Sequence, residues 1–208
     1  MLDRSLLPRD RKLVKMVWVY KVKRDGTLKA RLCVQGCSQV PGVDYHQTHC
    51  STMRAGSLRL LASVSSRFGL SMRRWDFASA FLQGDLEEGE VVYCFAPPGY
   101  ESVGADGQPR ICKVLKPIYG MAQAGRRWQR SLFPWLKEQG FEQLHADNCM
   151  FVKTHTYDDG TVDRLFVGVY VDDLAIGYSS DGTNSLYDLS TRVSSLTCKR
   201  AGRWKMRV

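Results

Sequence analysis

The chain has 208 residues, of which 44% are hydrophobic and 25% are charged. That balance supplies enough apolar material for a packed core and excludes an intrinsically disordered chain. No apolar run approaches the roughly 20 residues that a membrane-spanning helix needs, and the charged start is unlike a secretory leader, so we expect neither a membrane protein nor a secreted one.

Basic residues gather at both ends of the chain, whose formal net charge is +9. Residues 1–40 carry ten Lys and Arg against three Asp, and residues 199–207 carry five more cations without an acid. Because phosphate contacts dominate the affinity of proteins for nucleic acids, such ends favour a polyanionic ligand. A soluble basic protein with solvated lysine faces is the alternative.

Seven cysteines, an odd number without a CxxC pair, indicate neither a disulfide framework nor a zinc ribbon, and fit a reducing compartment. One cluster has metal-ligand residue types: Cys33, Cys37, His46 and His49, followed by Cys50. Its spacings are shorter than those of a zinc finger, and Cys33 lies in a strand-like run where a small thiol packs without metal. We therefore favour structural cysteines over a zinc site.

The first half of the chain predicts a basic hairpin and then alternating helix and strands. Residues 14–22 are rich in β-branched and aromatic side chains, residues 24–26 form a turn, and residues 28–35 return. Apolar spacing predicts a helix over 57–68 whose buried face holds Leu58, Leu61, Val64 or Ser65, and Phe68. Further strands are predicted at 70–78, 91–95 and 111–116.

The second half predicts a helix over 123–139, and Pro134 should kink or split it near Ser131. One face of this helix carries Trp128, Leu132, Trp135 and Leu136. Strands are predicted at 150–154, 165–171 and 174–178, and a last helix at 186–196. This mixed order, with hairpins and interposed helices, predicts an α+β fold: an antiparallel sheet with helices packed on one face.

Two adjacent acids, Asp172 and Asp173, join two apolar strands without the Gly or Asn that turns usually recruit. Ionised groups between buried strands are costly unless a cation compensates them, and a divalent metal with oxygen ligands does so. The pair Asp158-Asp159 differs, because it ends in Gly160 and sits among polar residues. We interpret that second pair as an ordinary hairpin tip.

A third acid, Asp76, ends the apolar strand predicted at 70–78. If that strand lies beside the hairpin of residues 165–178, Asp76 and Asp172 converge. Such a group can hold two divalent ions for in-line phosphoryl displacement. The alternative is that Asp76 only caps a short helix at 78–82.

Residues 170–173, Tyr-Val-Asp-Asp, resemble the YVDD box of reverse transcriptases. Further blocks, in family order over about residues 12–180, are similar to the copia-type retrotransposon branch. They are residues 18–23, 29–32, 41–45, 57–61, 76–86, 97–100, 119–120, 123–124 and 146–147, together with Gly36.

The resemblance implies the fingers and palm of a right-hand polymerase, within one domain spanning residues 1–208. It implies an RNA-directed DNA polymerase that joins a dNTP to a primer on an RNA or DNA template, with two Mg²⁺ ions or with Mn²⁺. The catalytic and metal-binding acids would be Asp76, Asp172 and Asp173. The implied location is the cytoplasm, in a virus-like particle, or the nucleus, and the remainder of a Pol polyprotein is an implied partner.

The resemblance also implies roles for basic and polar residues. Phe81 would stand at the steric gate against the ribose 2′-hydroxyl, although an aromatic at such a junction is commonly core. Gln123 would line the nucleotide pocket, and Lys29 or Arg31 would contact the triphosphate, since a bidentate Arg suits phosphate oxygens. Basic residues expected to contact nucleic acid are Lys21, Lys23, Arg126 and Arg127.

The chain departs from the family pattern in several places. Residues 122–126 read Ala-Gln-Ala-Gly-Arg, where the family usually has a Lys and a Pro. Residues 181–208 form a divergent basic tail, and we expect a truncated fragment without thumb or ribonuclease H. A catalytically inactive nucleic-acid-binding remnant is therefore the alternative function.

Overall fold

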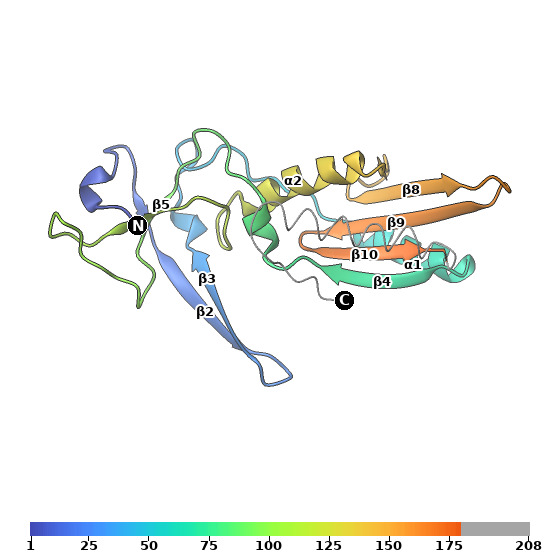
Figure 1. Ribbon diagram of the computed structural model, residues 1–208, viewed down its shortest axis with the longest axis horizontal. Coiled ribbons are helices and arrows are strands. Elements are labelled where there is room, and N and C mark those ends of the chain that lie inside the picture. Colours follow the sequence, from blue (N-terminus) through green and yellow to red (C-terminus); the bar gives the residue numbers. More distant parts are fainter. Residues whose placement is uncertain (180–208) are drawn as a thin grey trace. The chain divides into compact units, whose positions relative to one another are not determined.

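The computed structural model describes residues 1–179. The chain divides into two compact units, here called unit 1 (residues 1–49 and 84–128) and unit 2 (residues 50–83 and from 129 onward), with the boundary inside helix α2 (Ala124–Glu138) (Figure 1). The predicted helix at 186–196 and the tail at 181–208 lie outside the described residues. Within residues 1–179, no helix is both long and apolar enough to cross a membrane.

Unit 1 contains the predicted basic hairpin. Strands β2 (Met16–Val22) and β3 (Leu28–Val34) pair antiparallel along their whole length, which confirms the prediction. Gly26 in the connecting turn has a φ of +78°, which glycine adopts without steric cost. A separate three-stranded sheet has the order β1 (Leu13–Val14), β5 (Tyr93–Phe95), β6 (Ile111–Lys113), and short 3₁₀ helices span Arg4–Leu6 and Gly36–Ser38.

Two glycines let the base of this hairpin pack against the segment before α2. Gly120 has a φ of +88°, and a Cβ there would lie 2.0 Å from the carbonyl oxygen of Val34. A Cβ on Gly36 would lie 2.1 Å from the carbonyl oxygen of Gly120. The amide of Val34 donates to the carbonyl of Tyr119 at 2.8 Å. Any side chain at either glycine would separate these backbones.

Unit 2 contains a five-stranded sheet in which every neighbouring pair is antiparallel. This confirms the strands predicted near 70–78, 150–154, 165–171 and 174–178. In order across the sheet they are β4 (Ser71–Asp76), β10 (Asp173–Tyr178), β9 (Val162–Tyr170), β8 (Met150–Thr156) and the short β7 (Glu142–Gln143). A 3₁₀ helix, η3 (Ala80–Gln83), follows β4.

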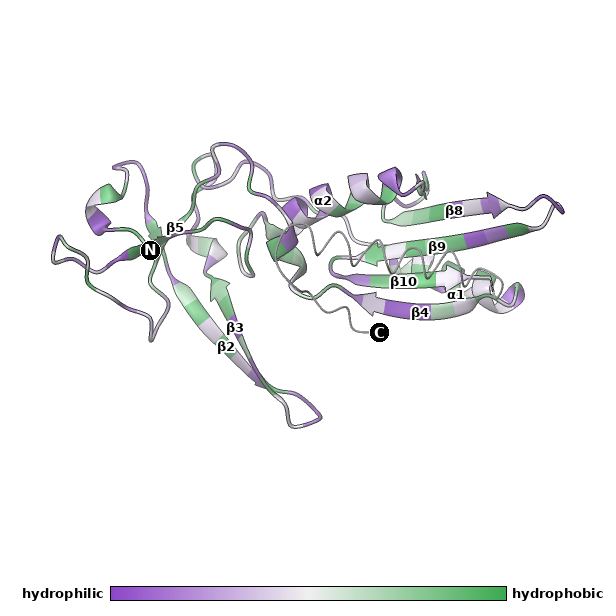
Figure 2. Ribbon diagram, viewed as in Figure 1, coloured by the Kyte–Doolittle hydropathy of each residue, from purple (hydrophilic) through white to green (hydrophobic). Residues whose placement is uncertain are grey.

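The expectation that the helices pack on one face of this sheet is wrong. Helix α1 (Ala55–Arg67) covers one face, because a Cβ on Gly177 would lie 3.1 Å from its Leu61. On α2, Phe133 packs its ring edge-to-face, 5.0 Å away, against Phe151, which shares a cross-strand row with Ile176. Since Ile176 and Gly177 point to opposite faces of the sheet, α1 and α2 lie on opposite faces as well. Figure 2 shows apolar residues along β9 and β10, as expected for strands covered on both faces.

Two details of the helices also differ from the predictions. Leu58 and Phe68, both expected on the buried face of α1, are 42% and 71% exposed. Phe68 is exposed because α1 ends at Arg67 and Phe68 leaves the helical conformation. Helix α2 runs through Pro134 without splitting. Its neighbours Leu132 and Leu136 are fully buried, so packing on both sides of the proline offsets the lost backbone hydrogen bond. The four apolar residues predicted for the face of α2 are all buried.

Candidate active site

Strand β4 lies beside β10, which is the arrangement on which the expected convergence of Asp76 and Asp172 depended, and this pairing sets Asp76 opposite Asp173. Asp76 is the register partner of Asp173, so both side chains leave the sheet on the same face. The amide of Phe77 donates to the carbonyl of Asp172 at 3.0 Å, which extends the pairing one residue beyond the strands. Asp76 is exposed, whereas Asp172 and Asp173 are half-buried.

The turn between β9 and β10 consists of Val171 and Asp172, and its backbone is strained. Val171 has a φ of +57°, a conformation that β-branched residues almost never adopt. A two-residue hairpin with positive φ at its first position normally has glycine there. Strain of this kind is held in place by its surroundings and concentrates at functional sites. The turn therefore supports a functional reading of residues 170–173.

An arginine from β4 contacts one of these acids. Arg74 donates from Nε to Oδ1 of Asp173 at 3.1 Å and from Nη2 to both carboxylate oxygens at 2.8 Å. Three carboxylates on one turn and a neighbouring strand are a suitable donor set for Mg²⁺, which prefers oxygen ligands. Within residues 1–179, however, no three His, Cys, Asp or Glu side chains are arranged around a common metal position, and this includes the Cys33–His49 cluster.

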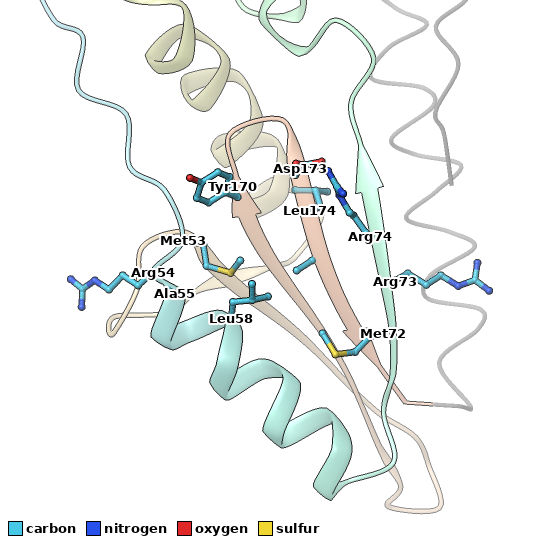
Figure 3. Close-up of a pocket in the computed structure, with 11 residues that line it drawn as sticks. Met53, Arg54, Ala55, Leu58, Met72, Arg73, Arg74, Tyr170, Asp173 and Leu174 are labelled. Carbon is cyan, nitrogen blue, oxygen red and sulfur yellow. Dashed lines mark hydrogen bonds and ion pairs between the residues drawn. The ribbon is translucent and has the colours of Figure 1, made fainter. Parts of the chain in front are cut away.

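A cavity of about 610 Å³ opens beside Asp173 (Figure 3). Its floor is mostly apolar, with Met53 and Leu58 from the α1 side and Met72 and Ala175 from the sheet. Arg74, Asp173 and Tyr170 lie together at one end of it. The carboxylate of Asp173 is thus the acidic group that this cavity presents.

Phe81, the predicted steric gate, lies in η3, five residues after Asp76, and is half-buried. Ser79, just before η3, has a φ of +54°, so the chain between Asp76 and Phe81 makes a sharp turn. The position fits a strand-to-helix junction, and both alternatives for Phe81, gate or core, stay predictions.

The basic residues predicted on the unit 1 hairpin share one face of it. Lys21 is the register partner of Lys29, and Val19 is the partner of Arg31. Lys21 and Lys29 are exposed, whereas the guanidinium of Arg31 stacks 3.7 Å above the ring of Tyr119. Lys23 lies at the end of this hairpin, where its amide donates to the carbonyl of Thr27.

Gln123 is fully buried in unit 1. Its Oε1 accepts from Nε2 of Gln39 at 3.1 Å, and its own Nε2 donates to the carbonyl of Asp44 at 3.2 Å. The carboxylate of Asp44 in turn accepts from the amide of Val40 at 2.7 Å. Gln123 therefore orients the loop of residues 39–45, and its place in a nucleotide pocket stays a prediction.

The two arginines predicted to contact nucleic acid occupy different environments. Arg126 is half-buried and bonds to Gln47 and, at 3.2 Å, to the carbonyl of His49. Arg127 is 1% exposed and forms ion pairs with Glu87 and Glu90. Its guanidinium is buried in unit 1 and paired with these acids, so the prediction that Arg127 contacts nucleic acid is not retained.

Sequence reasoning assigned no role to Asp147, which organises unit 2. It is 6% exposed, and its carboxylate accepts from the amide of Arg54 at 2.9 Å, the hydroxyl of Ser57 at 2.6 Å and the amide of Cys149 at 2.9 Å. An acid at this position caps the amino end of α1. Burial raises the pKa of Asp147, but these hydrogen bonds outweigh it and hold the pKa below its ordinary value.

The sequence of the chain is similar to known proteins over most of its length. Residues 3–195 match the family model described as reverse transcriptase (RNA-dependent DNA polymerase). The chain is 32% identical over 175 residues to the retrovirus-related Pol polyprotein from transposon TNT 1-94 of Nicotiana tabacum, which covers 82% of this chain. It is 34% identical over 185 residues to that from transposon RE1 of Arabidopsis thaliana, which covers 85%.

A more distant relative is the Ty1-DR4 Gag-Pol polyprotein of Saccharomyces cerevisiae, 23% identical over 167 residues. The chain spans only 13% and 12% of the length of the tobacco and Arabidopsis polyproteins. No solved structure shows significant similarity to it. The extent of the family match and the identity to the transposon polyproteins show that the chain belongs to the reverse transcriptases of copia-type retrotransposons.

Proposed function

We propose that this chain carries the catalytic acids of an RNA-directed DNA polymerase, which transfers a nucleotide from a dNTP to the 3′-hydroxyl of a primer. The observation that carries the proposal is the register of β4 against β10, which sets Asp76 opposite Asp173 beside the strained Val171-Asp172 turn. These positions come from sequence segments almost 100 residues apart, and their meeting is what a shared acidic centre requires.

Asp76, Asp172 and Asp173 would hold two Mg²⁺ ions, with Mn²⁺ as a substitute. When bound, such ions lower the pKa of the attacking hydroxyl and neutralise charge on the triphosphate. The chain itself supplies orientation. The β4–β10 pairing aligns Asp76 with Asp173, and the bond between the Phe77 amide and the Asp172 carbonyl ties the turn to the end of β4.

The unit 1 hairpin supplies the proposed contacts to phosphate. Lys21 and Lys29 lie directly opposite each other, and like charges in this arrangement destabilise a strand pair. A bound polyanion would remove that repulsion. We propose that Lys29 or Arg31 contacts the triphosphate and that Lys21, Lys23 and Arg126 contact the template–primer.

The remaining roles also stay proposals. Phe81 would discriminate deoxyribose from ribose, and Gln123 would shape the nucleotide pocket through the loop that it orients. The partners would be an RNA or DNA template–primer, dNTPs and the rest of a Pol polyprotein. The site of action would be a cytoplasmic virus-like particle or the nucleus.

A second candidate function is a catalytically inactive nucleic-acid-binding remnant. Two observations favour it: Asp173 is bound by an arginine, and the acids within the described part of the chain do not surround a metal position. This candidate retains the basic hairpin and loses the chemistry.

Primer extension by the full 208-residue chain distinguishes the two candidates. With a labelled RNA template–primer, dNTPs and Mg²⁺, we expect extension by the parent chain and a loss of about a thousandfold or more in Asp172→Asn, with template affinity unchanged. Asp159→Asn is the matched control, since it neutralises an acid of the other Asp-Asp turn. Template binding without extension by the parent chain would support the remnant, and extension by Asp172→Asn at the parent rate would refute the catalytic role.

A further inference from the structure

The contact between Arg74 and Asp173 places a cation at the proposed metal-binding acids. The guanidinium binds the carboxylate through two nitrogens, the geometry that gives charge-assisted hydrogen bonds their strength. Arg74 and Asp76 are two residues apart on β4 and therefore share a face. The contact is thus made on the same side of the sheet as Asp76 and Asp173.

The guanidinium forms an ion pair with Asp173, in which Nη2 of Arg74 lies 2.8 Å from Oδ1 of the carboxylate. Asp173 therefore already has a counter-ion. Because arginine keeps its charge at all physiological pH values, only movement of the side chain can remove it.

We propose that Arg74 competes with divalent cations for Asp173: the guanidinium neutralises the carboxylate in the absence of metal and must leave it before Asp173 can bind an ion. This inference rests on the proposed metal-binding role of the acids. Arg74 is a positioning residue in this account, since it acts through Asp173. Its side chain is 75% exposed, so it can turn into solvent while the sheet stays intact.

The exposure of Arg74 limits how strongly it can compete. Solvent and salt screen exposed ion pairs, and such pairs are weak compared with a carboxylate–metal bond. A guanidinium in this position therefore raises the cation concentration needed to load the site, and it does not close the site permanently.

Arg73 provides a matched control on the same strand. It points to the opposite face of β4, with its guanidinium 5.9 Å from the centre of the Tyr178 ring. Figure 3 shows Arg73 extending away from Asp173, whereas Arg74 reaches toward it. Replacing either residue by Gln removes one positive charge, but only the change at position 74 releases Asp173.

The test is Mn²⁺ binding to the full chain, measured by the electron paramagnetic resonance signal of free Mn²⁺. We expect Arg74→Gln to lower the dissociation constant about three- to tenfold relative to Arg73→Gln. Arg74→Lys should fall between the parent and Arg74→Gln, because an ammonium retains the charge without the bidentate contact.

Nuclear magnetic resonance provides a second measurement that needs no variant. On titration with Mg²⁺, the Nε–H resonance of Arg74 should move to its solvent-exposed position, while that of Arg73 stays. An unmoved Arg74 resonance at saturating Mg²⁺ would overturn the competition.

The outcomes separate this inference from the proposed function. Equal Mn²⁺ affinity in Arg74→Gln and Arg73→Gln, in a chain whose binding is lost in Asp173→Asn, overturns the competition and leaves the metal site. Failure of every variant to bind Mn²⁺, or binding that neither Asp76→Asn nor Asp173→Asn weakens, overturns the metal-binding role itself.

Discussion

Two Asp-Asp pairs lie at opposite ends of strand β9, and they differ in how the backbone makes its turn. Before β9, Gly160 takes the positive φ, +81°, and its amide donates to the carbonyl of Tyr157 at 2.9 Å. The carboxylate of Asp159 accepts from the amide and hydroxyl of Thr161. Asp158 and Asp159 are both exposed, and every feature of this turn serves its own closure.

After β9, the positive φ falls on Val171, for which it is costly. Asp173 belongs to β10, where β4 adds Asp76 and Arg74 beside it. Strand β4, from a distant segment of the sequence, thus contributes residues beside this turn. The Asp158-Asp159 turn has no such contribution among the described residues. The comparison teaches that an Asp-Asp pair indicates a functional site when the neighbouring strand of the sheet places further charged residues beside it.

Asp147 gives this comparison a purely structural acid in the same unit, and its loss should have the largest effect on stability. Asp147→Ala leaves the amides of Arg54 and Cys149 and the hydroxyl of Ser57 without their acceptor, at a cost of about 3 kcal/mol. Urea unfolding followed by tryptophan fluorescence measures it. Asp158→Ala, at an exposed position, is the control and should change stability by less than about 0.5 kcal/mol.

Much of this fold was predicted from local patterns. The local pattern of apolar and polar residues was enough to predict three features. They are the hairpin of β2 and β3, the strands of the unit 2 sheet and the buried face of α2. The pairing of β4 with β10 was only a condition in the sequence analysis, because strand order depends on contacts between segments that lie far apart in the chain; the structure meets that condition.

The features that were missed depend on contacts between distant residues. Arg127 reads as a surface cation, yet Glu87 and Glu90 draw it into the interior. Asp147 caps a helix that begins about 90 residues earlier, so no capping signal precedes that helix. The second packed face of the sheet could have been inferred from the uninterrupted apolar run in β9, which alternation would not produce.

Moving the strained residue type into the relaxed turn is the next test. Gly160→Val places a β-branched side chain at a φ of +81°, and should destabilise the chain by about 2 kcal/mol. Within residues 1–179, and apart from Gly160 and its two chain neighbours, no heavy atom lies within 4 Å of a Cβ at Gly160, so the loss would come from backbone strain. A stability equal to that of the parent in urea unfolding would contradict the account of this turn.

The reciprocal change, Val171→Gly, should stabilise the chain by about 1 kcal/mol. Relief of strain exceeds the entropy that glycine adds to the unfolded chain. If the strain at Val171 is retained for function, the Val171→Gly chain should be more stable than the parent but should not extend a primer faster. A Val171→Gly chain that is less stable than the parent would show that contacts of the valine side chain, and not its backbone, determine this position.

The smallest effect is the acid sensitivity of the two structural aspartates. Because its pKa in the folded chain is below the ordinary value of 3.8, Asp147 contributes its full stabilisation above that value. As the pH falls below 3.8 and through the lower folded pKa, the unfolded chain takes up the proton first and the contribution is lost. The pKa of Asp159 is also lowered, chiefly by the Thr161 hydroxyl, but solvent screens this exposed group.

Between pH 5 and pH 3, the urea midpoint should therefore fall less in Asp147→Asn than in the parent, while Asp159→Asn should follow the parent closely. If the urea midpoint became less dependent on pH to the same extent in both variants, Asp147 and Asp159 would stabilise the folded chain equally. An acid that joins distant segments would then contribute no more to stability than an acid that only closes its own turn.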